Sequence, residues 1–553
     1  MSTKRLGKLS FVVVTISIVG FVAFRGPGDQ YFAIAKNLDI FATLYKEVNT
    51  YYVDEVNPNK LMKIGIDAML KSLDPYTNYI PEDDIEDYRT MTTGQYGGIG
   101  AVIGKRGGKN LVLMPYRGFP AEKSGLKIGD ELLEVDGIDV TDKNVTEISK
   151  LLKGQANTDL TLTIKRYGEE YTLPVTMKRE RITVDNVPYS GMVTEDVGYI
   201  KLSNFTTGAG REVEKALIRL KEEGAKKIVF DLRGNPGGLL SESVNVSNVF
   251  VPKGSEIVST KGKVKDWNKT YRAPHNPVDT DIPLVVLTSS RSASAAEIVS
   301  GVVQDYDRGV LVGEKTFGKG LVQATRPLTY NSQLKVTTAK YYTPSGRCIQ
   351  AIDYSHRGED GSVGRVPDSL RNAFETKSGR VVYDGGGVNP DVKVKPGRLA
   401  PITVSLITKN LIFDFATKYY FEHPKAPESK TFEISEADYD SFMTWLSDKD
   451  YDYVTEVEQT IDDLTEISKD EKYYENIKEQ IALLRTQVQH NKEKDLGKFK
   501  DEIKESLEEE IVARYHLSDG KIEASFDDDA TLQAAISVLN DSKRYKKLLQ
   551  VQE

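Results

Sequence analysis

The sequence is poor in the residues that build disulfides and transition-metal sites. Its 553 residues include one cysteine, Cys348, and five histidines that lie far apart in the chain. A single cysteine cannot form an intrachain disulfide, and it excludes a multi-cysteine zinc or iron–sulfur site. No HExxH or HxxxH pair is present, so neither a metal-dependent hydrolase nor any cofactor is expected. The net charge of −8 argues against nucleic acid as the main ligand.

Glycine and proline are scarce in the last quarter of the chain. Residues 421–553 contain two Gly and two Pro, although the whole chain has 44 Gly and 21 Pro. The same residues carry 18 Lys and Arg against 33 Asp and Glu, a net charge of −15, whereas residues 1–420 carry +7. A glycine-rich mixed α/β body followed by an acidic helical extension over residues 398–553 is therefore predicted. The length alone predicts about three or four domains.

Helical periodicity runs through this extension. Amphipathic helices are predicted over Leu406–Tyr420, Ala437–Leu446, Tyr451–Leu464, Tyr474–Leu496, Leu496–Tyr515 and Ala530–Leu549. Asp527 to Asp529 could suggest a metal loop, but they lack EF-hand spacing and precede a helix, which favours a solvated N-terminal turn. The extension is expected to dock an adaptor, a second copy of the chain or the body of the same chain. The sequence does not choose among these partners.

One long uncharged run is present, at the N-terminus. It extends over 16 residues from Leu9 to Phe24, behind the basic residues Lys4, Arg5 and Lys8. The run is slightly long for a signal-peptide core and slightly short for a full membrane span. Residues 1–28 are predicted to be an uncleaved signal anchor or a cleaved signal peptide. The alternative is an ordinary helix buried in the core. The remainder would then work on the periplasmic side of the bacterial inner membrane or be secreted.

Two modules are predicted before residue 181. Residues 31–92 show helical spacing interrupted at Pro75, and they predict a helical N-terminal region. Residues 93–180 contain short strands, an Asp136-Gly137 hairpin signal and the motifs P-A-x-x-S-G-L and G-D-x-L-L-x-V-D-G. This module closely resembles a PDZ domain, with an unrelated β-module as the alternative. The resemblance implies capture of a C-terminal peptide, whose carboxylate would be held by backbone N–H groups of Gly97, Gly98, Ile99 and Gly100.

Residues 181–397 form the next predicted domain, in which strands and helices alternate. Buried strands are predicted at 198–202, 227–232, 284–288 and 310–313, and helices at 211–222 and 295–303. Strands joined by helices indicate an α/β layer structure.

Two loops of this domain carry residues suited to chemistry. Asp231 to Leu240 follows a buried strand and precedes a helix, where free N–H groups suit a developing oxyanion; a plain tight turn is the alternative. Ser290 to Glu297 also ends a strand and opens a helix, which would expose the hydroxyl of Ser294 in the positive field of the helix terminus. Here the alternative is an ordinary N-cap, since Glu297 would complete a capping box.

A nucleophilic serine needs a base, and no histidine lies near either loop. Lysine can serve if burial lowers its pKa toward neutrality. The segment Glu314 to Gly320 offers Lys315 and Lys319. Lys319 lies between glycines and is followed at four residues by Gln323, which could orient an amine. Lys315 is expected to be a solvated surface charge.

Taken together, the motifs D-L-R-x-N-x-G-G, S-A-S-A-x-E and G-E-x-T-F-G-K-G-x-x-Q behind a PDZ module resemble the carboxy-terminal processing peptidases. The resemblance covers about residues 35–395, including S-L-D-P-Y at 72–76 and G-V-N-P-D at 387–391. It implies a protease core of the crotonase or ClpP-like kind and a Ser–Lys dyad. By motif position, the implied nucleophile is Ser294, the base Lys319 and the residue that orients the base Gln323.

The same resemblance implies oxyanion donors on the backbone of Gly237, Gly238 and Ala295. The sequence departs from the common pattern once, because a frequent further serine is Ala296 here. The predicted protein is thus a multidomain α/β serine endopeptidase that acts on protein C-termini. Two other classes remain open: a catalytically silent PDZ binding or chaperone protein, and a scaffold whose acidic helices are the functional part.

Overall fold

The computed structural model describes residues 27–395, 397–488 and 492–550, which divide into one unit that ends at Tyr79 and another that begins at Ile80. The predicted signal segment at residues 9–24 lies outside the described residues. The first unit consists of two helices, α2 (Pro27–Tyr51) and α3 (Pro58–Lys71), as the helical spacing predicts. Asn57 caps α3 by accepting a hydrogen bond from the N–H of Lys60 at 3.0 Å. Among the helices described, none is long and apolar enough to span a membrane.

The second unit begins with α4 (Ile85–Thr93) and a β-module of short antiparallel strands. The sheet order is β3-β4-β5-β7-β8, with β6 paired to β5. Helices α5 (Pro120–Lys123) and α6 (Val145–Leu152) cover it, and Asn144 and Glu147 form a capping box at α6. The strands are β3 (Ala101–Arg106), β4 (Lys109–Pro115), β5 (Glu131–Val135), β6 (Ile138–Asp139), β7 (Asp159–Lys165) and β8 (Leu173–Lys178). Strand β2 (Gln95–Gly98) enters the module and pairs with the exit strand β9 (Glu180–Thr183).

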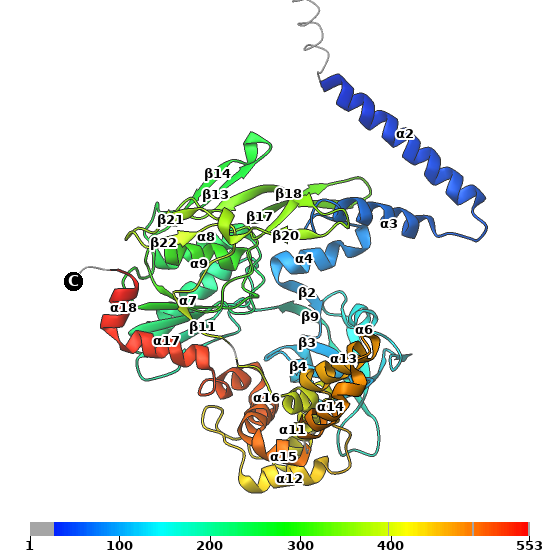
Figure 1. Cartoon of the computed structure of the whole chain (residues 1–553), viewed down its shortest axis with the longest axis vertical. Helices are drawn as coiled ribbons and strands as arrows, with labels where there is room; N and C mark the ends of the chain where they lie inside the picture. The colour runs from blue at the N-terminus through cyan, green and yellow to red at the C-terminus, as the bar shows by residue number, and fades with distance from the viewer. Residues whose placement is uncertain (1–26, 396, 489–491, 551–553) are drawn as a thin grey trace, which may run out of the picture. The chain divides into compact units, whose positions relative to one another are not determined.

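A six-stranded sheet organises the next domain in the order β10-β11-β12-β15-β16-β23. All neighbouring pairs in it are parallel except β10 with β11. The strands are β10 (Tyr189–Met192), β11 (Val197–Lys201), β12 (Lys227–Asp231), β15 (Leu284–Thr288), β16 (Val310–Gly313) and β23 (Val392–Lys393). Helices α7 (Ala209–Glu222), α8 (Leu240–Phe250) and α9 (Ala295–Asp305) share one apolar core with the sheet, which confirms the predicted α/β layers (Figure 1).

A smaller antiparallel sheet stands beside this layer. It contains β13 (Glu256–Gly262), β14 (Lys269–Arg272), β17 (Leu321–Pro327) and β18 (Gln333–Tyr342). Strands β17 and β18 form a hairpin, in which Gln323 pairs with Thr337 and Thr325 pairs with Lys335. Two ribbons follow in the chain, β19 (Ile352–Arg357) with β20 (Val363–Arg365), and β21 (Ala373–Glu375) with β22 (Val381–Tyr383).

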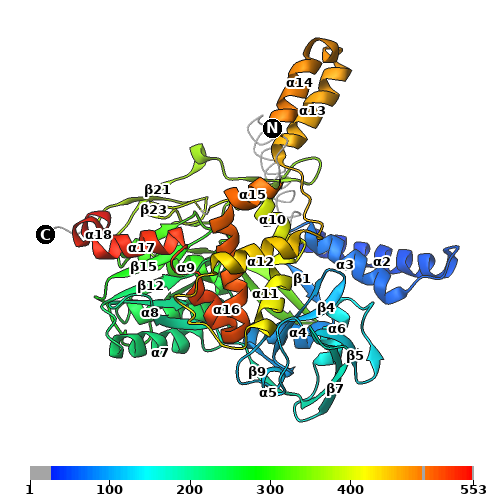
Figure 2. The same cartoon turned by 90° about the horizontal axis from the view of Figure 1, so that it is seen from below.

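The C-terminal extension is helical, as the sequence predicts, but it has more breaks than predicted. Asn410 adopts a left-handed conformation (φ 65°) and divides the first predicted helix in two, because this residue type tolerates that conformation. Helices α13 and α14 lie side by side (Figure 2). The helices are α10 (Pro401–Thr408), α11 (Leu411–Glu422), α12 (Glu436–Leu446), α13 (Glu456–Asp470), α14 (Tyr474–Val488), α15 (Lys492–Lys498), α16 (Lys500–Ala524), α17 (Ala530–Asn540) and α18 (Ser542–Leu548).

The end of the extension packs against the six-stranded sheet rather than standing apart. Leu532, Ile536 and Leu539 of α17 share a buried apolar cluster with sheet residues such as Val285 and Val312. This cluster covers the sheet face opposite the one that faces α7, α8 and α9, since alternate residues of each strand belong to the two clusters. Helix α17 therefore completes a three-layer α/β/α arrangement around the central strands (Figure 2).

Candidate active site

Ser294 occupies a strained position between a buried strand and a buried helix. It follows β15 and directly precedes α9, and its backbone angles are φ 57° and ψ −114°. An ordinary N-cap residue has extended backbone angles, and a serine at positive φ costs roughly 1–3 kcal/mol. Ser294 is the N-cap residue of α9 and Glu297 completes a capping box, as the alternative predicts, but its positive φ departs from an ordinary N-cap. Strain of this kind is typical of positions where the fold holds a side chain for chemistry.

Glu297 joins the Ser294 loop to the Lys319 loop. Its carboxylate is fully buried and accepts the N–H of Ser294 at 2.9 Å, which is the backbone contact expected of a capping box. The same carboxylate accepts the N–H groups of Gly318 (2.7 Å) and Lys319 (2.8 Å) and the hydroxyl of Thr316 (2.5 Å). Burial raises the pKa of Glu297, and these four donors oppose that rise. Sequence reasoning recognised Glu297 only as a cap, because the far loop is invisible to local spacing.

The predicted catalytic residues line one cleft. The cleft has a volume of about 550 Å³, and Ser294, Lys319 and Gln323 all contribute to its wall. Gly237, Gly238 and Ala295, the predicted oxyanion donors, line it as well. The apolar part of the cleft wall is formed by side chains from several elements: Met91, Val184, Leu239, Leu240, Ile298, Leu321 and Val322. A concave, mixed apolar and polar site of this size can hold a peptide segment.

The β17–β18 hairpin forms another part of the cleft wall. Gln323 donates from Nε2 to Thr337 Oγ1 at 3.2 Å, so its amide is oriented by a cross-strand neighbour. Lys319 is half-buried at the start of this hairpin. A second lysine, Lys335, also lines the cleft, and burial lowers its pKa. The sequence offered no signal for Lys335, because it lies in an ordinary strand. Lys315 does not line the cleft.

The Gly237-Gly238 turn lies directly against Ser294. Gly237 has φ +94°, and a Cβ built on it would lie 2.8 Å from the Cβ of Ser294 and 2.7 Å from the carbonyl oxygen of Ala293. Only glycine fits this approach. The N–H of Gly237 donates to Asn235 Oδ1 at 2.8 Å, so Gly237 is already engaged and is removed from the predicted oxyanion donors. Gly238 and the first residue of α9, Ala295, remain as the predicted oxyanion donors.

The predicted peptide-carboxylate loop runs from the end of β2 to the residue before β3 in the β-module. Gly98 and Ile99 line a small pocket of about 90 Å³ together with Val145 and Leu152 of α6. Gly97 of β2 pairs with Arg181 of β9, and a Cβ on Gly97 would lie 2.0 Å from the Gly154 carbonyl oxygen. Gly100 has φ +72°, which turns the chain into β3. The loop thus contributes Gly98 and Ile99 to the pocket, whereas Gly97 and Gly100 shape the backbone.

The Asp527–Asp529 turn differs from its prediction. Asp529 does cap α17, as expected, by accepting the N–H groups of Thr531 and Leu532, both at 3.0 Å. It is not solvated, however: its side chain is 17% exposed and forms an ion pair with Arg233. In the part of the chain that the structure describes, no group of His, Cys, Asp and Glu side chains is arranged to hold a metal ion.

Family models match three parts of the chain. The model of peptidase family S41 matches residues 196–355, a PDZ domain model matches residues 112–166, and the model "Probable PDZ-protease, C-terminal helical domain" matches residues 402–539.

Relatives among the curated proteins match over longer stretches. A "Carboxy-terminal-processing protease" of Bartonella bacilliformis is 36% identical over 321 residues, which is 57% of this chain and 73% of that protein. A "Probable CtpA-like serine protease" of Staphylococcus aureus strain MRSA252 is 38% identical over 356 residues, covering 63% and 71%. Among solved structures, the "Photosystem II D1 C-terminal processing protease" is 28% identical, with a TM-score of 0.34 and coverage of 65% and 93%.

The fold and these relatives define a serine peptidase that combines a PDZ domain, an α/β protease core and a C-terminal helical domain. The chain belongs to peptidase family S41, among the carboxy-terminal-processing proteases.

Proposed function

We propose that this chain is an endopeptidase that cleaves proteins near or from their C-termini, with Ser294 as nucleophile and Lys319 as general base. The observation that carries the proposal is the shared cleft: Ser294, Lys319 and Gln323 line it together. The strained backbone of Ser294 at the N-terminus of α9 supports the assignment. The Glu297 carboxylate supports it further, because it ties the two catalytic loops together through four hydrogen bonds.

The proposed reaction is acyl transfer. Neutral Lys319 takes the proton of the Ser294 hydroxyl, and Oγ attacks the scissile carbonyl carbon. The oxyanion accepts hydrogen bonds from the N–H groups of Gly238 and Ala295. When the C–N bond breaks, the leaving amine takes the proton from Lys319, and water then hydrolyses the ester with Lys319 again acting as base. Gln323 orients the lysine amine.

The PDZ domain is proposed to capture the substrate tail. Its pocket between β3 and α6 is lined by apolar side chains, including Ile99, Ile103, Val145 and Leu152. An extended peptide could add as a strand along β3, with its last apolar side chain in the pocket and its carboxylate at the Gly98-Ile99 backbone. The proposed substrates are therefore proteins with accessible, apolar C-termini.

The experiment that tests the proposal uses an unfolded reporter protein with an apolar C-terminus. Wild type is expected to cleave it, and Ser294→Ala and Lys319→Ala are expected to lose cleavage. Lys335→Ala identifies which cleft lysine is the base, because the proposal expects cleavage to persist in it. Lys315→Ala, in the same loop as Lys319 but outside the cleft, is the matched control for folding. Full residual cleavage by Ser294→Ala or Lys319→Ala would refute the dyad.

Export and membrane attachment are a separate proposal. It rests on the basic residues and the uncharged run of residues 9–24, which predict a signal anchor or a cleaved signal. The chain would then act on the periplasmic side of the inner membrane. Fractionation of cells carrying the full chain tests this, and recovery of all the protein in the cytoplasmic fraction would refute it.

A further inference from the structure

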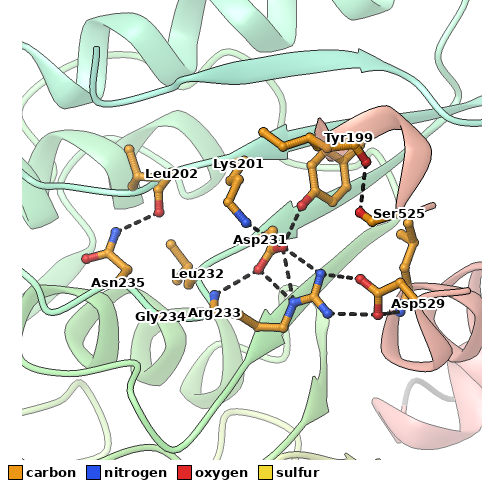
Figure 3. A network of polar contacts seen from close by, with 12 residues as sticks. Tyr199, Lys201, Leu202, Asp231, Leu232, Arg233, Gly234, Asn235, Ser525 and Asp529 are labelled. Atoms are coloured by element: carbon orange, nitrogen blue, oxygen red, sulfur yellow. Dashed lines mark hydrogen bonds and ion pairs between the residues drawn. The ribbon is translucent and has the colours of Figure 1, made fainter. Parts of the chain in front are cut away.

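A network of four charged side chains lies beneath the loop that approaches Ser294. Asp231 ends β12 and is fully buried, and Tyr199 donates its hydroxyl to Asp231 Oδ2 at 2.5 Å. Arg233 folds back on the same carboxylate, with Nη2 2.7 Å from Oδ2 and Nε 3.0 Å from Oδ1 (Figure 3). Lys201 approaches Oδ2 at 3.7 Å. Although burial opposes ionisation, Arg233 and Lys201 hold the pKa of Asp231 at about 2.

The fourth charge comes from the C-terminal extension. Arg233 donates from Nη1 to Asp529 Oδ1 at 2.8 Å, and its Nη2 lies 2.6 Å from Oδ2, which is a bidentate arrangement (Figure 3). The two side chains are 23% and 17% exposed, so the pair is largely withdrawn from water. Two carboxylates and two cations balance in this network. Loss of one partner from such a pair leaves an uncompensated buried charge, which is strongly unfavourable.

Asp529 is fixed from its own side as well. It caps α17, and α17 packs on the sheet through Leu532, Ile536 and Leu539. Phe526, three residues before Asp529, packs edge-on against Tyr199 at 5.3 Å between ring centroids. The carboxylate is therefore held at a fixed place relative to β12 by apolar packing on both sides.

The loop that holds Arg233 is connected directly to the nucleophile loop. The N–H of Gly234 donates to Ser289 Oγ at 3.0 Å, and the N–H of Ala293 donates to the Asn235 carbonyl at 2.9 Å. Ser292 Oγ donates to the Leu232 carbonyl at 2.8 Å. The same loop continues into the Gly237-Gly238 turn against Ser294. A shift of the Arg233 backbone would therefore move the turn that presents the Gly238 N–H.

We propose that Asp529 is a positioning residue for the protease reaction: through Arg233 it fixes residues 231–239, and so the Gly238 oxyanion donor. The C-terminal helical domain then supplies part of the support of the active site. This proposal rests on the proposed function, because it assigns the loop to the oxyanion. Interactions that matter most in the transition state affect kcat more than KM.

The test is made on the full chain with Asp529→Asn. Asparagine keeps the side-chain oxygen that caps α17 but removes the charge that faces Arg233. The matched control is Asp541→Asn, which makes the same change at the cap of α18, where Asp541 accepts the N–H of Arg544 at 2.9 Å. Asp529→Asn is expected to lower kcat at least tenfold with KM close to wild type, at a temperature where circular dichroism shows the variant folded. Its unfolding temperature is expected to fall, because Arg233 loses one of its two carboxylate partners. Asp541→Asn is expected to leave kcat unchanged, and Asp529→Glu to recover part of the loss.

Three results would overturn the proposal. The first is wild-type kcat in Asp529→Asn, and the second is an equal loss in Asp541→Asn. The third is a loss of kcat in Asp529→Asn that is no larger than the unfolded fraction of the variant, with no recovery of kcat in Asp529→Glu. Circular dichroism measures the unfolded fraction, and anisotropy of a fluorescent C-terminal peptide checks that the folded fraction still binds the tail. Ser294→Ala is run in parallel: if it still cleaves, the proposed function fails, whereas wild-type kcat in Asp529→Asn with inactive Ser294→Ala refutes only the positioning role.

Discussion

Replacing Glu297 by glutamine should uncouple the Ser294 loop from the Lys319 loop while leaving the volume of the side chain almost unchanged. The carboxylate has one oxygen toward Thr316 and Gly318 and the other toward the N–H groups of Ser294 and Lys319. An amide NH2 cannot accept from any of these N–H groups. Its least costly orientation places the NH2 toward Thr316, whose hydroxyl can rotate to accept, and leaves the Gly318 N–H unpaired.

The size of the effect follows from this count. One buried N–H without an acceptor costs about 1–3 kcal/mol. Each remaining hydrogen bond loses its charge assistance, roughly 1 kcal/mol apiece, although a neutral amide is cheaper to bury than a carboxylate. We therefore expect the free energy of unfolding to fall by about 2–4 kcal/mol. A displacement of Ser294 relative to Lys319 approaching 1 Å should lower kcat on the order of 100-fold.

The assay combines urea unfolding with steady-state cleavage of a reporter that bears an apolar tail. Glu242→Gln is the matched control, because Glu242 is also buried but accepts one backbone N–H, from Gly210 at 2.9 Å, which an amide oxygen can retain. The control should keep its kcat and lose little stability. If Glu297→Gln unfolds within about 0.5 kcal/mol of wild type and keeps wild-type kcat, the coupling assigned to Glu297 is wrong.

Four further predictions concern the site, the PDZ domain and the extension. If Lys319 is the general base, as proposed, it must be neutral to act, so kcat/KM should rise from neutral toward alkaline pH; a flat pH profile would count against that role. Gly237→Ala should lower kcat on the order of 100-fold with tail binding intact, since a Cβ there meets atoms of residues 293–295 at 2.7–2.8 Å; wild-type kcat would contradict this. Val145→Asp in the PDZ pocket should raise KM for tail-bearing proteins and spare short peptides, because its charge repels the tail carboxylate; an equal change for both substrates would refute tail capture. In the extension, burial and then Asp528 raise the pKa of Glu505 to about 7, so the folded state retains a proton that the unfolded chain has released. The free energy of unfolding should therefore fall as pH rises from about 5 through 7, by about one kcal/mol at most from Glu505 after screening by solvent. A higher unfolding temperature at pH 8 than at pH 5.5 would contradict this sign.

Local sequence was sufficient for the elements and for most of the candidate site. Strand–loop–helix boundaries follow from hydrophobic period and from glycine and serine at the junctions, which are properties of a few neighbouring residues. The motifs around Ser294, Lys319 and Gly238 therefore pointed to positions that share one cleft. The PDZ domain was recognisable for the same reason, since its turns and short strands have local signatures.

Contacts between distant segments were beyond the reach of local sequence. Three of the four donors to Glu297 come from residues 316–319, and they reach its carboxylate only when that loop packs against α9. The break at Asn410 shows the same limit, because helical spacing continues across it.

Asp529 shows most clearly what each level determines. The sequence alone established that it begins a helix, because an aspartate before an amphipathic stretch is a favoured cap. Whether that aspartate meets water or Arg233 depends on apolar packing that brings α17 onto a sheet assembled about three hundred residues earlier in the chain. Capping is a short-range interaction that a few residues specify, whereas an ion pair across domains needs the whole core to place its two charges together.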